Sequence, residues 1–195
     1  MTDPLLIDIP ERLDAERTVL QVPRAGMGAE MAVVIAQSLA HLRPWMPWAQ
    51  EAPSAESAEL VVRRMQADFL ARNDLCFHTF SRRADGSPGR LLGGTGLHRI
   101  DWAVRKFEIG YWIRPEAAGR GHVSEAVALL TALAFERLAA RRVEIRCDAR
   151  NSKSRAVAER CGFELEGVLR QDALGVDGQP RDTCVYARVS AGITG

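Results

Sequence analysis

Residues 107–127, FEIGYWIRPEAAGRGHVSEAV, constrain the fold of this chain more than any other stretch. From 107 to 113 the apolar residues occupy every second position, which is the period of a half-buried strand. Pro115 ends that strand, because proline has no N–H to donate to a neighbouring strand. After Gly121 the apolar spacing becomes that of a helix. The stretch therefore predicts a strand, a tight turn and a helix in direct succession.

The turn between this strand and this helix has the features of an anion site. Gly119 and Gly121 lack a Cβ, so the backbone there can approach a ligand closely. The first N–H groups of a helix are unpaired and carry a partial positive charge, and Arg120 adds a full charge. Phosphate is the expected ligand. These residues match the dinucleotide-binding fingerprint only weakly, and an ordinary strand-to-helix connection explains them equally well.

The composition limits the kinds of protein that this chain can be. Its 195 residues suit one domain, 1–195, with a polar lead-in at 1–17 and a short tail at 190–195. The 26 basic and 25 acidic residues nearly balance, which argues against a nucleic-acid or membrane-surface binder. The sequence has no apolar run of about 20 residues and no basic start of a signal peptide. The four cysteines and four histidines form no disulfide or metal motif, so we expect a cytoplasmic protein without a metal.

The remaining periodicity predicts a mixed sheet with helices between its strands. Helical spacing occurs at 29–42 and 54–72, and a short helix is expected to follow Asn151. Ser54 is a suitable N-cap for the second of these helices. Its expected buried face consists of Leu60, Val61, Met65 and Phe69. Further strands are expected at 18–22, 75–81, 91–100, 142–147, 164–170 and 182–189.

Two long segments resemble the GNAT acetyltransferases: 105–127, RKFEIGYWIRPEAAGRGHVSEAV, and 142–170, RVEIRCDARNSKSRAVAERCGFELEGVLR. The chain is similar to the RimJ/RimL branch, which acetylates N-terminal amines of ribosomal proteins. LRPWMPW at 42–48 and the G-V-x-R…D-G-x-x-R-D hairpin add to this resemblance, which covers 18–189. It implies an α/β (α+β) GNAT fold. In this fold a central mixed, mostly antiparallel twisted sheet of about seven strands is flanked by helices and splayed at the central strand.

The resemblance also implies acetyl-CoA as the donor co-substrate. The pyrophosphate is expected on the N–H groups of the turn, and the pantetheine arm beside the end of the central strand. The turn residues are Gly119, Arg120, Gly121, His122, Val123 and Ser124, and the strand residues are Trp112, Ile113 and Arg114. The chain departs from the family pattern at Ala118 and Val123.

Asn151 and Ser154 have two interpretations. By resemblance, Asn151 hydrogen-bonds the pantetheine arm and Ser154 lies near the thiol. From the residues alone, Asn151 is a helix N-cap and Ser154 is a surface residue of that helix.

Acetyl transfer to an amine needs a base, donors for the thioester oxygen and a proton for the leaving thiolate. We predict Glu108 as the base, with an ion-paired strand carboxylate as an equal alternative, and N–H groups near Ile113 as the donors. Ala158 stands where many GNAT enzymes carry a proton-donating tyrosine, so Ser154, Tyr111 or water is expected to replace it. Cys147 and Cys161 fit core patterns, so direct transfer is predicted rather than an acetyl-cysteine intermediate.

The predicted acceptor-binding residues are Trp45, Trp48 and His98. The two tryptophans lie in a proline-rich loop, where large aromatic residues form either a core plug or a pocket wall. His98 is expected to orient the substrate or to act as an alternative base, although a packed histidine is the commoner case. The acceptor is a peptide N-terminus or a small-molecule amine, and a homodimer is expected by resemblance.

Two other functions are compatible with parts of the sequence. A GNAT-fold sensor that binds CoA without turnover fits the alanine at position 158. A Rossmann oxidoreductase is rejected because its glycine loop would follow the first strand, whereas Gly119 and Gly121 lie in mid-chain.

Overall fold

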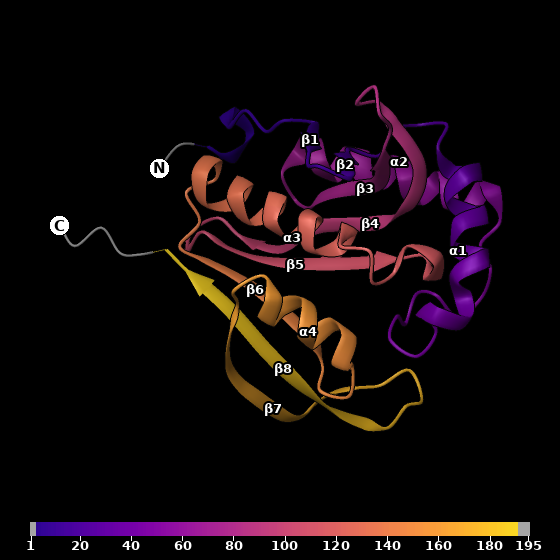
Figure 1. The fold of residues 1–195 in the computed structure, drawn as a ribbon. Helices are drawn as coiled ribbons and strands as arrows, with labels where there is room; N and C mark the ends of the chain where they lie inside the picture. Colours follow the sequence, from indigo (N-terminus) through magenta and orange to yellow (C-terminus); the bar gives the residue numbers. More distant parts are fainter. Residues whose placement is uncertain (1–2, 191–195) are drawn as a thin grey trace.

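The computed structural model describes residues 3–190, which form one eight-stranded sheet with helices on both faces (Figure 1). The order in the sheet is β1-β2-β3-β4-β5-β6-β8-β7, and all neighbours are antiparallel except β5 and β6. The strands are β1 (Arg12–Asp14), β2 (Thr18–Gln21), β3 (Leu75–Arg82), β4 (Pro88–Asp101), β5 (Lys106–Ile113), β6 (Arg142–Asp148), β7 (Glu164–Leu174) and β8 (Pro180–Val189). The helices are α1 (Gly28–Leu42), α2 (Ala55–Ala71), α3 (His122–Ala132) and α4 (Ser152–Arg160), with 3₁₀ turns η1 (Pro4–Leu6) and η2 (Pro115–Ala117) and a π-helical turn η3 (Leu133–Arg137).

The expected mixed, mostly antiparallel sheet is confirmed, but about seven strands is one too few. The additional strand is β1, inside the segment 1–17 that the sequence predicts to be only a lead-in. Its three residues, with the single apolar Leu13, are too few for a periodic pattern, so its pairing with β2 defines it as a strand. Residues 1–2 and 191–195, including most of the expected tail, lie outside the described residues. The assignment of 1–195 to one domain stays a prediction.

The buried face of α2 differs from the expected one. Ser54 does cap this helix, since its Oγ accepts a hydrogen bond from the Ser57 N–H at 3.0 Å. Phe69 is buried as expected, but the Leu60 side chain is 50% exposed. The reason is the packing of α2 against α1, where a Cβ on Gly28 would lie 2.3 Å from the Glu59 Cα. This contact turns Ala58 and Val62 inward instead of Leu60 and Val61.

The sheet splays open between β5 and β6, as the sequence analysis expects. The two strands pair only over Lys106–Glu108 and Arg142–Glu144, at the start of each strand. Beyond that point β6 continues to pair with β8, while β5 pairs only with β4. Figure 1 shows the two strands diverging from this junction. From Ile109 to Ile113, the edge of β5 that faces β6 is therefore unpaired.

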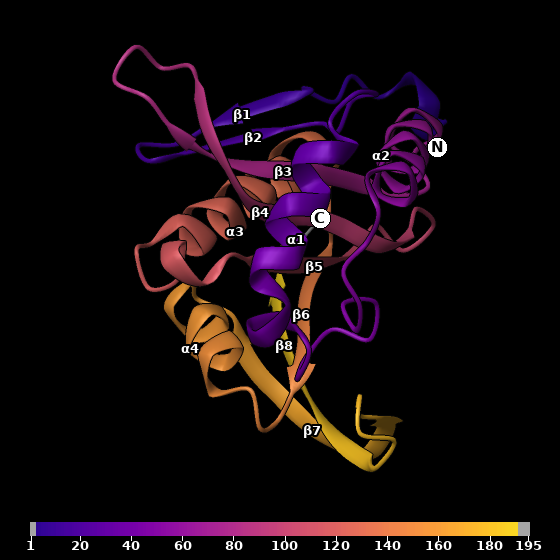
Figure 2. The same cartoon turned by 90° about the vertical axis from the view of Figure 1, so that its right-hand side faces the viewer.

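Helices cover the two faces of the sheet separately, with α3 and α4 on one side and α2 on the other (Figure 2). The larger core cluster lies between the sheet and α3 and includes Phe107, Ile109 and Leu130. A smaller cluster packs α1 against the sheet through residues such as Met31 and Ile35. None of the helices within residues 3–190 is both long and apolar enough to cross a membrane.

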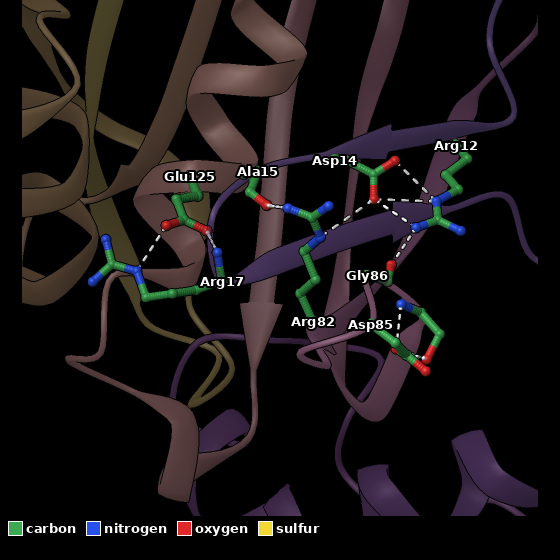
Figure 3. A network of polar contacts seen from close by, with 9 residues as sticks. Arg12, Asp14, Ala15, Arg17, Arg82, Asp85, Gly86 and Glu125 are labelled. Carbon is green, nitrogen blue, oxygen red and sulfur yellow. Dashed lines mark hydrogen bonds and ion pairs between the residues drawn. The ribbon is translucent and has the colours of Figure 1, made fainter.

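Polar contacts tie the β1–β2 hairpin to two other parts of the fold (Figure 3). The Arg12 guanidinium donates to the carbonyl oxygen of Gly86, in the turn between β3 and β4, at 2.6 Å. Arg17 donates from its backbone N–H and from Nε to the carboxylate of Glu125, at 3.1 and 2.7 Å. Glu125 lies in the first turn of α3, so the N-terminal segment holds this helix at its N-terminus.

Candidate active site

A cavity of about 520 Å³ lies where β5 and β6 separate. Its lining includes Tyr111 and Trp112 of β5, and Asn151 and Ser154 at the start of α4. Residues of α1, of α2 and of the segment between them complete the wall on the other side of the sheet. Ligand-binding sites are concave and few per protein, so this cavity is the candidate site.

The glycine turn at the end of β5 is built for an anion, although it lies outside the cavity lining. Gly119 and Gly121 have φ angles of +74° and +87°, a region in which glycine is favoured. No described side chain caps the N-terminus of α3, so its first N–H groups are free for a ligand. The guanidinium of Arg17 lies 3.3 Å from the position of a Cβ on Gly121. The sequence analysis missed Arg17, which only the folding of the N-terminal hairpin brings to the turn.

Two of the predicted donor-binding side chains are engaged elsewhere. The Arg114 guanidinium is buried and donates to the Gln37 side chain at 2.6 Å and to Glu116 at 3.0 Å. The His122 Nδ1 lies 3.0 Å from the Thr18 hydroxyl. In this arrangement the Arg114 guanidinium and the Nδ1 of His122 already have partners within the protein.

The unpaired edge of β5 carries the backbone groups that an extended ligand could use. The Arg114 N–H donates to the Leu92 carbonyl of the β4 side at 2.7 Å. Successive residues of a strand direct their N–H groups to opposite edges, so those of Tyr111 and Ile113 face the open side. The Ile113 N–H therefore lies on the open edge of β5, and its role as a donor to the thioester oxygen stays a prediction. The Trp112 ring packs edge-on against Trp48, with ring centroids 5.7 Å apart.

The structure brings Tyr111, Ser154 and Asn151 together across the splay. The Tyr111 hydroxyl lies 2.9 Å from the Ser154 Oγ. Burial raises the pKa of Tyr111 above its ordinary value, so the phenol keeps its proton. Asn151 Oδ1 accepts from the Ser154 N–H at 3.0 Å, so Asn151 is a helix N-cap and also lines the cavity.

Glu108 is not brought to the cavity. It lies at the paired end of β5, where its carboxylate accepts hydrogen bonds from Arg99 Nη1 at 2.7 and 2.6 Å. The cavity lining begins at the next residue of the strand, Ile109. The ion-paired carboxylate, which was the alternative interpretation, describes this position.

His98 forms a hydrogen-bonded cluster with Asp74 and Cys76 at the cavity wall. The His98 Nδ1 lies 2.7 Å from Asp74 Oδ1, and the Cys76 thiol donates to Asp74 Oδ2 at 3.7 Å. A neutral imidazole that donates from Nδ1 keeps the lone pair of Nε2 free to accept a proton. Burial is the main cause that raises the pKa of the Cys76 thiol, which therefore stays protonated.

Two glycines make room for the His98 ring. Its Nε2 lies 3.0 Å from where a Cβ of Gly96 or Gly110 would stand, so a side chain at either position would displace the ring. Pairing of Leu75 with Leu97 sets the register that brings Asp74 next to His98. Sequence reasoning found His98 but missed Asp74 and Cys76, because this register is not readable from either strand alone. Donor atoms of the three lie within 4.8 Å of one another, and the absence of a metal stays a prediction.

Comparison with known proteins identifies the family. Residues 24–164 match the family model described as an acetyltransferase (GNAT) domain. The chain belongs to the GNAT acetyltransferase family. It is 37% identical over 161 residues to a Bacillus subtilis (strain 168) protein provisionally named ribosomal N-acetyltransferase YdaF. The aligned residues cover 80% of this chain and 82% of that protein.

Two solved structures share the GNAT fold of this chain. One is RimL, a ribosomal L7/L12 alpha-N-protein acetyltransferase in complex with coenzyme A, with a TM-score of 0.83, 23% identity, and coverage of 92% of this chain and 98% of that chain. The other is the microcin C7 self immunity acetyltransferase MccE in complex with acetyl-CoA and AMP, with a TM-score of 0.81, 24% identity, and coverage of 90% and 94%.

In this GNAT acetyltransferase, position 158 cannot supply the proton-donating tyrosine. Ala158 is fully buried in the core. The cavity lining instead contains the hydroxyl pair of Tyr111 and Ser154. Burial raises the pKa of Cys147 to about 11 and also raises that of Cys161. Protonated thiols are poor nucleophiles, which supports direct transfer in this GNAT chain.

The cavity wall contains a second histidine besides His98. His78 is 2% exposed and lines the cavity together with Trp45, Trp48 and His98. Burial lowers the pKa of His78 to about 4, so its ring is neutral at physiological pH. The sequence analysis did not single out His78, because a strand of mostly apolar residues gives no sign that one histidine faces a cavity.

The burial of His78 predicts that stability is lost in acid. Its pKa in the folded protein, about 4, lies below the ordinary 6.5. As the pH falls through this window the unfolded chain binds the proton first, so the free energy of unfolding decreases. The difference corresponds to about 3 kcal/mol at the acid end. Denaturant unfolding between about pH 7 and 4 should show this additional loss in the wild type but not in His78→Phe.

The other histidines with lowered pKa values do not affect this comparison between the wild type and His78→Phe. Burial also lowers the pKa of His41 and of His122, but both residues are present in the variant and their contributions cancel. Parallel pH profiles of the two proteins would contradict the assignment of a neutral, buried His78.

Proposed function

We propose that this GNAT protein transfers the acetyl group of acetyl-CoA to a primary amine by direct attack. The observation that carries the proposal is the cavity at the separation of β5 and β6, beside the uncapped N-terminus of α3. An unpaired strand edge can hydrogen-bond an extended pantetheine arm, and a helix N-terminus can bind the phosphates of the same molecule. The activity of the family supports the same function.

The donor is held mainly by backbone groups in this proposal. The pyrophosphate binds the N–H groups from Gly119 to Ser124, with Arg120 and Arg17 supplying positive charge. The pantetheine arm follows the open edge of β5 and reaches Asn151 at the start of α4. The Ile113 N–H donates to the thioester oxygen as negative charge develops there.

His98 replaces Glu108 as the proposed base. The amine nitrogen attacks the thioester carbon, the C–S bond breaks, and His98 Nε2 accepts the proton that the amine loses. Asp74 holds Nδ1 and so fixes the tautomer that leaves Nε2 free. The leaving thiolate receives a proton from the hydroxyl pair of Tyr111 and Ser154, and solvent restores that proton.

The acceptor is proposed to be a protein or peptide N-terminal amine or a small-molecule amine. The names of YdaF and RimL, which refer to ribosomal or ribosomal-protein acetylation, support the first class. The amine enters from the side of Trp45 and Trp48, which line the cavity as expected for a pocket wall. Cytoplasmic location follows from this choice of acceptor, and direct binding of nucleic acid or membrane is not part of the proposal.

A homodimer is proposed through the C-terminal strands. β7 is the edge strand of the sheet, and Leu165, Val168 and Leu169 on it are largely exposed. Exposed apolar side chains on a long edge strand favour pairing with another copy.

Two measurements test the proposed function. Calorimetric titration with acetyl-CoA, CoA and NAD tests the donor, and thiol release from acetyl-CoA with peptide N-termini and small amines tests the transfer. We expect binding of acetyl-CoA, no binding of NAD, and thiol release that requires an amine. Tight acetyl-CoA binding without transfer to any amine would favour a CoA-binding module without turnover. Failure to bind either CoA species would refute both functions.

A further inference from the structure

His78 is a buried side chain of the cavity, and residues 3–190 supply no hydrogen-bond partner for it. Among the side chains of residues 3–190, the buried nitrogens without a partner are Arg72 Nε and both ring nitrogens of His78. Buried polar groups are nearly always hydrogen-bonded, because leaving one unpaired costs free energy. His78 is 2% exposed and lines the cavity, so a molecule bound in the cavity is the candidate for the missing partner.

His78 and the proposed base lie on the same face of the sheet. His78 pairs with Gly94 across the β3–β4 register. The ring of His98 lies over Gly96 and Gly110, which form the next row of that face. Neighbouring rows are two residues apart, which is about 7 Å along the strands. A molecule whose amine reaches His98 can therefore reach His78 with a second polar group.

We propose that His78 recognises the acceptor through a hydrogen bond to a neutral polar group, a hydroxyl or an amide, several bonds from the reacting amine. This inference rests on the proposed function and names its acceptor class as peptide-like amines and amino alcohols rather than plain alkylamines. A neutral imidazole offers one N–H donor and one acceptor nitrogen, which together suit an amide or a hydroxyl. It offers no opposite charge to a carboxylate or a second ammonium group.

The surrounding wall makes this contact discriminating. The lining of the cavity that contains His78 includes the apolar residues Met31, Ile35, Trp45 and Met65. A polar group buried against such side chains costs free energy unless it is hydrogen-bonded, so an amide in this cavity needs a partner such as His78. An analogue without the polar group leaves the imidazole unpaired, and sites built to bind a polar group reject such analogues strongly.

Binding of two matched amines tests the inference. Alanyl-alanine amide carries amide groups along its length, whereas hexylamine has a similar length and none. In titrations of the CoA-bound protein, His78→Phe is expected to weaken binding of the dipeptide amide at least tenfold and to leave hexylamine unchanged. His78→Gln keeps a donor and an acceptor and is the matched control, expected to retain most of the affinity. The ratio of the two kcat/KM values should change in the same way.

The stability of the ligand-free variants separates recognition from a structural role. An apolar ring at position 78 removes the unpaired nitrogens, so His78→Phe is expected to raise the Tm by about 2–4 °C at neutral pH. A structural role would lower it. Unchanged dipeptide affinity in His78→Phe, or equal losses for both amines in a variant that still binds CoA, would overturn the inference. A wild type that binds the dipeptide amide selectively but transfers no acetyl group would refute the proposed function alone.

Discussion

Replacement of His98 by glutamine is expected to lower kcat by about 10²- to 10⁴-fold, the usual contribution of a positioned general base. The variant keeps a polar side chain of similar length but cannot take up the proton from the attacking amine. Binding of acetyl-CoA should be unchanged, because His98 lies on the acceptor side of the cavity. Steady-state kinetics with a saturating amine, together with calorimetry for the donor, measures both quantities.

Replacement of Asp74 gives a second readout. Asp74→Asn should cause a smaller loss than His98→Gln, because the imidazole remains but is no longer held through a carboxylate.

Glu108→Gln is the matched control for the base. This carboxylate is bound by Arg99 outside the cavity lining, so its replacement should leave kcat nearly unchanged. If Glu108→Gln were as inactive as His98→Gln is expected to be, and His98→Gln remained active, then the original assignment from the sequence would be correct and the base proposed here would be wrong.

A carboxylate at position 119 is expected to reduce acetyl-CoA affinity on the order of 100-fold relative to a neutral side chain of the same shape. Gly119 has a φ of +74°, and a Cβ there would meet nothing within 4 Å. Asn and Asp both tolerate this conformation, so Gly119→Asn and Gly119→Asp carry the same backbone cost. They differ in one negative charge beside the pyrophosphate, a repulsion of several kcal/mol at close range.

Calorimetry at low and high salt measures this difference. The gap between the two variants should narrow as salt increases, because exposed charges are screened. Equal affinities for Gly119→Asp and Gly119→Asn, with unchanged thermal melting, would show that the phosphates bind elsewhere.

The strand, turn and helix of residues 107–127 could be predicted because each carries a local signal. The alternation of β5, the glycines of the turn and the spacing of α3 all appear in the structure where the pattern puts them. The splay could not be derived from periodicity, and its expectation came from the resemblance to the family. The resemblance also implies roles for Tyr111 and Ser154, and the structure places their hydroxyls in contact.

The parts that could not be predicted depend on register and on contacts between distant segments. Asp74 meets His98 only through the pairing of β3 with β4. Arg17 reaches the glycine turn only because the N-terminal hairpin folds against α3. The position of Glu108 on the central strand suggests a base. The structure shows that Glu108 is the last residue of β5 that pairs with β6, and that the cavity lining begins one residue later, at Ile109.

The short junction between β5 and β6 divides the sheet into two leaves joined at one corner. Three residue pairs connect the leaf β1–β5 to the leaf β6–β8. The tryptophans of the loop after α1, together with His78 and His98, all belong to the N-terminal leaf, whereas Asn151 and Ser154 belong to the C-terminal one. The N-terminal leaf also carries the glycine turn and the open edge of β5, so the proposed donor site uses both leaves, whereas the proposed acceptor residues all belong to one. A bound donor would bridge the two leaves, and the protein would use its own co-substrate as the missing strand.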